Sequence, residues 1–61
     1  MRQLVDEIVE TWLNGNRKDA LDAILALKKA KACLVTAYVY DLLSDYDKGV
    51  FGRMLQTRSE I

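Results

Sequence analysis

The chain of 61 residues contains no histidine, no proline and a single cysteine, Cys33. One cysteine cannot close a disulfide within the chain, and without histidine it cannot form a structural zinc site of the Cys/His type. A chain of this length hides only about 60% of the surface that the unfolded polypeptide exposes. Domains this small therefore usually need a disulfide, a metal site or another added source of stability. We therefore expect a single helical domain over residues 1–61 that is stabilised by close helix packing or by self-association.

Groups that catalyse reactions are equally scarce. The lack of histidine removes the usual general base near neutral pH and excludes Ser-His-Asp and Cys-His arrangements. Cys33 stands among apolar neighbours, where we expect a buried thiol that acts as a small hydrophobic residue. The acids that begin at Asp45 do not continue into a calcium loop, because Gly49 and Gln56 stand where the loop needs ligands. No glycine-rich phosphate loop is present either. We expect no enzyme activity, no cofactor, no metal ion and no small-molecule substrate.

Long apolar runs and an excess of one charge are also absent. The longest uncharged run, residues 32–40, has nine residues, whereas a membrane-spanning helix needs about 20. The first ten residues carry three acids and one base and lack the apolar segment of a secretory signal. Nine Lys and Arg balance nine Asp and Glu, which removes the overall positive field that attracts nucleic acid. Together with the unpaired thiol, these features predict a cytoplasmic protein that does not bind a membrane.

Apolar residues recur at helical spacing along the chain. The pattern predicts an all-α domain of three or four helices with the third one central, over about residues 2–14, 17–29, 31–44 and 45–58. Trp12 lies near the centre of the first apolar arc. Gly15 then suits the left-handed conformation that ends a helix, and Asn16 is a candidate cap for the next one. Ser44 and Asp47 form a capping-box-like Ser-x-x-Asp pattern that opens the last helix.

The junction between the second and third helices carries no turn residue, so the sequence leaves open whether the two are separate or continuous. A continuous helix over residues 17–44 would be about 42 Å long, too long for the first helix to cover. This favours a break near residues 29–31. The lysines before the break then suit the C-terminal end of the second helix, where positive charge is favoured. Lys28 falls inside the apolar stripe of that helix, where its stem lies along the apolar surface or its charge points at a partner.

Residues 31–44 are apolar nearly all round. The main stripe consists of Leu34, Val35, Tyr38, Val39 and Leu42. The reverse face carries Cys33, Thr36, Ala37 and Tyr40, our candidate protein interface. In so small a protein, a helix that is apolar on both faces usually needs a second chain. The alternative is that the first or the last helix covers this reverse face. The run 34–40 also resembles a β-strand in composition, but a lone strand would have nothing in the chain to pair with.

Positive charge gathers at six candidate contact residues for nucleic acid or a partner: Lys28, Lys29, Lys31, Lys48, Arg53 and Arg58. In a helix-turn-helix interpretation, residues 31–44 form the first helix and residues 45–58 the recognition helix, which offers Arg53, Gln56, Thr57 and Arg58 to the groove. The acids Asp41, Asp45 and Asp47 oppose that interpretation, because they lie where the recognition helix would meet phosphates. The plainer interpretation is that the basic residues are solvated.

These observations predict a small non-enzymatic interaction protein, an adaptor, regulator or inhibitor, that acts through protein–protein contacts. Tyrosine and tryptophan, which interfaces favour as anchors, support this prediction, and self-association as a homodimer would supply the missing stabilisation. The alternative is a small helical DNA- or RNA-binding regulator that uses the basic residues at 28–31 and 48–58. A short chain without a tail or a motif is typical of bacterial or phage accessory proteins.

Overall fold

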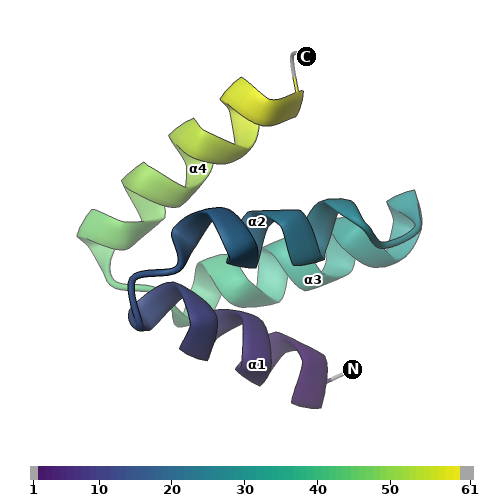
Figure 1. Cartoon of the computed structure of the whole chain (residues 1–61), viewed down its shortest axis with the longest axis horizontal. Helices are drawn as coiled ribbons and strands as arrows, with labels where there is room; N and C mark the ends of the chain where they lie inside the picture. Colours follow the sequence, from purple (N-terminus) through teal and green to yellow (C-terminus); the bar gives the residue numbers. More distant parts are fainter. Residues whose placement is uncertain (1, 60–61) are drawn as a thin grey trace.

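The computed structural model describes residues 2–59 and contains four α-helices. They are α1 (Arg2–Leu13), α2 (Arg17–Leu25), α3 (Lys29–Leu42) and α4 (Asp45–Ser59). Consecutive helices run in alternating directions, and α1 and α4 lie on opposite sides of the α2–α3 pair (Figure 1). Residues 2–59 include no β-strand. The predicted all-α class is confirmed, and the strand alternative for residues 34–40 is wrong.

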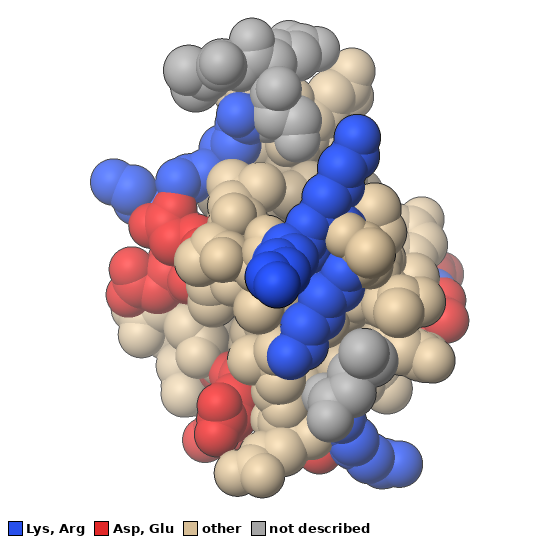
Figure 2. Space-filling model, turned by 90° about the vertical axis from the view of Figure 1, so that its right-hand side faces the viewer, with Lys and Arg blue, Asp and Glu red and all other residues tan. Residues whose placement is uncertain are grey.

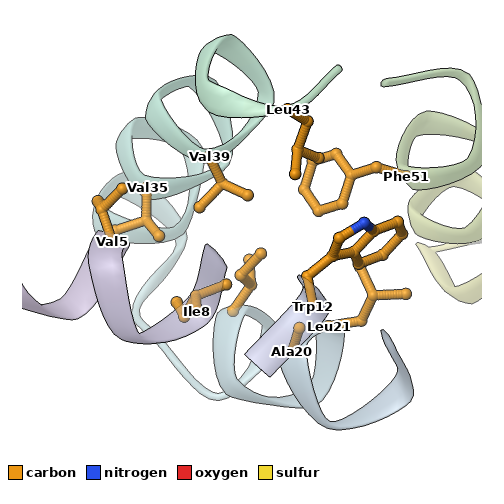
Figure 3. Packing of buried hydrophobic residues seen from close by; sticks show 10 residues of the cluster. Val5, Ile8, Trp12, Ala20, Leu21, Val35, Val39, Leu43 and Phe51 are labelled. Atoms are coloured by element: carbon orange, nitrogen blue, oxygen red, sulfur yellow. The ribbon is translucent and has the colours of Figure 1, made fainter. Parts of the chain in front are cut away.

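Nine buried side chains from the four helices and Leu43, directly after α3, form one apolar cluster: Val5, Ile8, Trp12, Ala20, Leu21, Ile24, Val35, Val39, Leu43 and Phe51. Trp12 is only 2% exposed, as its place in the first apolar arc predicts. Its ring meets Phe51 edge-on, with centroids 5.4 Å apart and planes at 84° (Figure 3), a geometry that aromatic pairs favour. Among the described side chains of α4, only Phe51 is fully buried. The attachment of α4 to the core therefore depends on this ring.

Local sequence signals mark the C-terminal end of α1 and the start of α4. Gly15 has a φ of +92°, the left-handed conformation that is predicted after α1. Asn16 precedes α2, but its side chain makes no capping hydrogen bond, so the predicted side-chain cap is wrong. The backbone N–H of Asp47 donates to Ser44 Oγ at 3.3 Å, and the Ser44 hydroxyl donates to the Asp47 carboxylate at 3.2 Å. Ser44 therefore caps the start of α4 as predicted, and the Asp47 carboxylate accepts from the Ser44 hydroxyl, whereas in a full capping box it accepts from the backbone N–H of the cap residue.

The break between α2 and α3 comes earlier than predicted. α2 ends at Leu25, and Lys28 has an extended backbone (φ −60°, ψ 148°) directly before α3. Leu27 packs against the core, which indicates that tertiary packing overrides helix propensity at this point. Lys28, Lys29 and Lys31 therefore surround the start of α3, the end at which the helix dipole disfavours positive charge. Lys28 is exposed, so its predicted place inside an apolar stripe of α2 is wrong.

Two ion pairs link α4 to α2. Arg17 Nη2 lies 3.6 Å from Asp47 Oδ1 near the start of α4, and the Arg58 guanidinium donates to the Asp22 carboxylate near its end. The Arg17 guanidinium also lies 5.2 Å from the centroid of the Trp12 ring, within cation–π range. As a result, α4 is held by a buried ring in its middle and by a charge pair toward each end.

Candidate protein-interaction site

The central feature of the site is that α3 carries two apolar stripes, of which only one is buried. The buried stripe consists of Val35 and Val39 on α3 and Leu43 directly after it, which are at most 5% exposed. The exposed stripe consists of Leu34, Tyr38 and Leu42, which are 50%, 51% and 59% exposed. The residues of each stripe follow one another at intervals of about one helical turn. The sequence pattern groups all of these residues except Leu43 into one main stripe, but the other helices cover α3 from the valine side only.

A groove of about 410 Å³ separates the exposed stripe from α1, and its lining consists of Arg2, Val5, Asp6, Tyr38, Asp41 and Leu42. Val5 is buried and supplies an apolar floor. Arg2 Nε lies 3.8 Å from Asp6 Oδ2 at the rim, and Asp41 is an exposed residue on the side of α3. One base and two acids leave this rim with a net negative charge. The groove thus suits an apolar side chain that is accompanied by a cation.

The residues predicted as the protein interface, Cys33, Thr36, Ala37 and Tyr40, form a second face of α3, here named the Cys33 face. Cys33 and Ala37 are exposed, Thr36 is half-buried and Tyr40 is 43% exposed. The ammonium of Lys48 on α4 lies 5.5 Å from the Tyr40 ring centroid. The chain itself therefore covers this face only in part. The expectation of a buried Cys33 thiol is wrong for the single chain.

The six predicted basic contact residues do not form one surface. Lys28, Lys29 and Lys31 surround the start of α3, whereas Lys48 lies beside its other end, about 20 Å away for a helix of this length. Figure 2 faces the end of the molecule where α2 leads into α3, and basic side chains cross the middle of that face while acids lie toward its edges. The lysines at the start of α3 are thus the basic group that remains open to solvent at this end.

The residues that the helix-turn-helix interpretation offers to a groove are partly engaged within the chain. The Arg58 guanidinium is bonded to Asp22, and the Thr57 hydroxyl donates to the Arg53 carbonyl oxygen at 3.0 Å. Asp45 and Asp47 occupy the first turn of α4, where a recognition helix would approach phosphates. These contacts and charges weaken the recognition-helix interpretation.

A second cavity, of about 330 Å³, lies at the turn between α1 and α2 and is lined by Trp12, Leu13, Gly15, Arg17 and Asp47. The Trp12 indole N–H is buried and has no acceptor among the described residues. The charges at this cavity already neutralise each other, because Arg17 and Asp47 form an ion pair. The cavity is therefore a weaker candidate than the groove beside the exposed stripe.

Residues 2–59 contain neither a cluster of metal ligands nor a helix suited to cross a membrane. Over residues 2–59, no three acidic, cysteine or histidine side chains gather closely enough to hold a metal ion. Over the same residues, no helix combines the length and the apolar character that a membrane crossing requires. Exposed apolar surface is thus the main feature that α3 offers to another molecule.

Comparisons with known proteins identify no relative of this chain. No protein-family model matches the chain, and neither does any curated protein or any solved structure. Inferences about function therefore rest on the exposed side chains of α3 and on the charges around them.

Proposed function

We propose that this chain is a small non-enzymatic interaction protein of the cytoplasm, an adaptor, regulator or inhibitor, which acts through protein–protein contacts and forms a homodimer. The observation that carries this proposal is the concentration of exposed apolar side chains on one helix. Four of the seven large apolar side chains that are exposed in the described residues belong to α3: Leu34, Tyr38, Tyr40 and Leu42.

The energetic support comes from the hydrophobic effect. Complete burial of a leucine side chain contributes about 1.5–3 kcal/mol, and Leu34 and Leu42 keep half or more of their surface in water. Contiguous apolar patches on small proteins mark contact surfaces, and tyrosine is enriched among the residues that dominate binding energy. A partner that covers the outer side of α3 would supply stabilisation that a core of ten buried residues does not.

The mass of the protein in solution tests this proposal. We expect light scattering to give twice the chain mass of 7.0 kDa at about 100 µM, and a value that falls toward the chain mass on dilution, as mass action requires. Tyr38→Glu and Tyr40→Glu form a matched pair, because each places a carboxylate on a different face of α3. At least one of the two should give a folded monomer. A wild-type mass of 7.0 kDa at every concentration would contradict the homodimer.

A second candidate function is binding to DNA or RNA through the start of α3. The observation that favours it is that three exposed lysines surround a helix N-terminus that has no side-chain cap, an environment that attracts phosphate groups. We expect such binding to weaken steeply with salt and to fall when Lys28, Lys29 and Lys31 are changed together to alanine. Arg53→Ala is the matched control on α4. No retention on DNA or RNA at about 50 mM salt removes this candidate.

A further inference from the structure

We propose that the exposed stripe packs against the same stripe of a second copy of the chain, with the two α3 helices antiparallel and the two Tyr38 side chains facing each other at the two-fold axis. This inference rests on the proposed homodimer. It adds which face of α3 forms the contact between the two copies, here named the seam, and the direction in which the two helices pack. It differs from the sequence-based prediction, which places the seam on the Cys33 face.

The spacing of the stripe is self-complementary in this register. Leu34 lies one turn before Tyr38, and Leu42 lies one turn after it. A two-fold interface uses the same surface of both subunits. When Tyr38 lies at the axis of an antiparallel pair, Leu34 therefore faces Leu42 of the partner subunit, and the reverse contact follows by symmetry. Each aliphatic side chain meets another aliphatic side chain, and the aromatic ring meets its own copy.

Charge favours the antiparallel direction over the parallel one. Lys31 lies at the N-terminal end of the stripe, while Asp41 and Asp45 lie at its C-terminal end, and all three are exposed. Antiparallel packing brings the basic end of each helix to the acidic end of the other. Parallel packing would bring lysine to lysine and aspartate to aspartate, and such like-charge contacts oppose association. The direction is therefore set by charge, while the apolar stripe supplies the attraction.

The groove beside the stripe provides a place for one of these contacts. It opens next to Tyr38 and Leu42, at the acidic end of α3, and its floor is Val5. In the antiparallel register, Leu34 of the partner subunit lies beside this groove, and Lys31 of the partner subunit follows toward the acidic rim. The groove thus receives the combination that its lining suits, an apolar side chain and a nearby cation.

The Cys33 face stays outside this seam. At 100° per residue, Cys33 lies well round α3 from Tyr38, and the side chain is exposed in the single chain. Both copies of the dimer therefore keep a Cys33 face open to solvent. This face then remains available for contact with a different protein, as the proposed function requires.

Charge-reversal variants test the direction of packing. Lys31→Glu and Asp41→Lys should each weaken the dimer about tenfold at low salt, because each converts two symmetry-related attractions into repulsions. The double variant Lys31→Glu/Asp41→Lys restores opposite charges across an antiparallel seam, and its dissociation constant should return to within about threefold of the wild-type value. Dissociation constants are measured by sedimentation equilibrium at about 50 mM salt, where exposed charges are least screened.

Lys29→Glu is the matched control. It makes the same charge change in the same first turn of α3 and gains the same favourable interaction with the helix dipole, but Lys29 points away from the exposed stripe. We expect less than about a threefold change in its dissociation constant, and circular dichroism should show helix content at or above the wild-type level in both glutamate variants.

The outcomes separate this inference from the proposed homodimer. A wild-type protein that is monomeric at every concentration overturns both. A stable dimer that neither single variant weakens overturns the antiparallel seam and leaves the homodimer standing. Weakening in the single variants without recovery in the double variant also overturns the seam, because it shows that Lys31 and Asp41 of the partner subunit do not lie near each other across it.

Discussion

The two apolar stripes of α3 differ in what covers them rather than in how apolar they are. The buried stripe is closed off by α1, α2 and Phe51 of α4, and its three residues are at most 5% exposed. The exposed stripe lies about a third of a turn away round the same helix and keeps half or more of its surface in water. The helix therefore contributes only one of its stripes to the core of the single chain.

This difference shows that a short chain can fold around one side of a helix and leave a second apolar side for association. The core needs the branched, compact side chains of Val35 and Val39, which lie against the neighbouring helices at 0% exposure. Tyr38 of the exposed stripe is 51% exposed, and tyrosine suits an interface because it combines an apolar ring with a polar hydroxyl. Substitutions in one stripe should therefore affect folding, and substitutions in the other should affect association.

The largest expected effect is the loss of folding caused by an aspartate in the buried stripe. The same residue in the exposed stripe should leave the chain folded. Val39→Asp buries an unpaired charge in a fully enclosed position, which should cost about 4 kcal/mol or more and leave the chain unfolded at 25 °C. Tyr38→Asp, one residue earlier, places the same charge in water. It should leave a helical monomer with a cooperative unfolding transition, which circular dichroism with urea would show. Equal loss of helix in both variants would contradict the distinction between the stripes.

Truncation to alanine should also affect folding in the buried stripe and association in the exposed stripe, with smaller changes in stability than aspartate causes. Val35→Ala removes buried methyl groups and should lower the free energy of unfolding by about 2 kcal/mol at any protein concentration. Leu34→Ala should change the stability of the dilute monomer by less than about 0.5 kcal/mol. In concentrated solution it should instead lower the Tm, because it weakens the dimer that stabilises the fold. A concentration-independent loss in Leu34→Ala would place this residue in the core.

Much of the fold was predictable from local signals in the sequence. The apolar arc around Trp12, the glycine after α1 and the Ser44 cap of α4 each depend on neighbouring residues, and the structure agrees with all three. The break before α3 comes earlier than the sequence predicts, because nothing in the local sequence marks it. Packing of Leu27 against the core decides that boundary, and a long-range contact leaves no local pattern.

The candidate site was less accessible to sequence reasoning. The two stripes of α3 follow the same spacing, so periodicity predicts an apolar helix without showing which stripe faces the core. Tyr38 offered the only hint, since its hydroxyl needs a polar partner or water when the ring is packed. The position of Lys48 over Tyr40 was equally hidden, because it depends on how α4 crosses the end of α3.

Thiol reactivity should show which face of α3 is covered in the dimer. The single cysteine, Cys33, should react with a disulfide reagent at rates within about twofold in monomer and dimer, because it lies outside the proposed seam. Leu34→Cys in a Cys33→Ser background is the matched comparison, and its thiol should react about tenfold more slowly in the dimer. Protection of Cys33 on dimerisation would instead place the seam on the Cys33 face and overturn the one argued for the exposed stripe.

The smallest expected effect concerns the contact between Lys48 and Tyr40, which closes one edge of the Cys33 face. A double-mutant cycle with Lys48→Gln and Tyr40→Leu should give a coupling energy of about 0.5 kcal/mol in urea unfolding, the size expected of an exposed cation–π contact. The coupling should persist in a Tyr38→Glu background, because the contact lies within one chain and does not need the dimer. Coupling that vanishes in this monomeric background would mean that association orders the contact, and the Cys33 face would then belong to the seam rather than to an open surface.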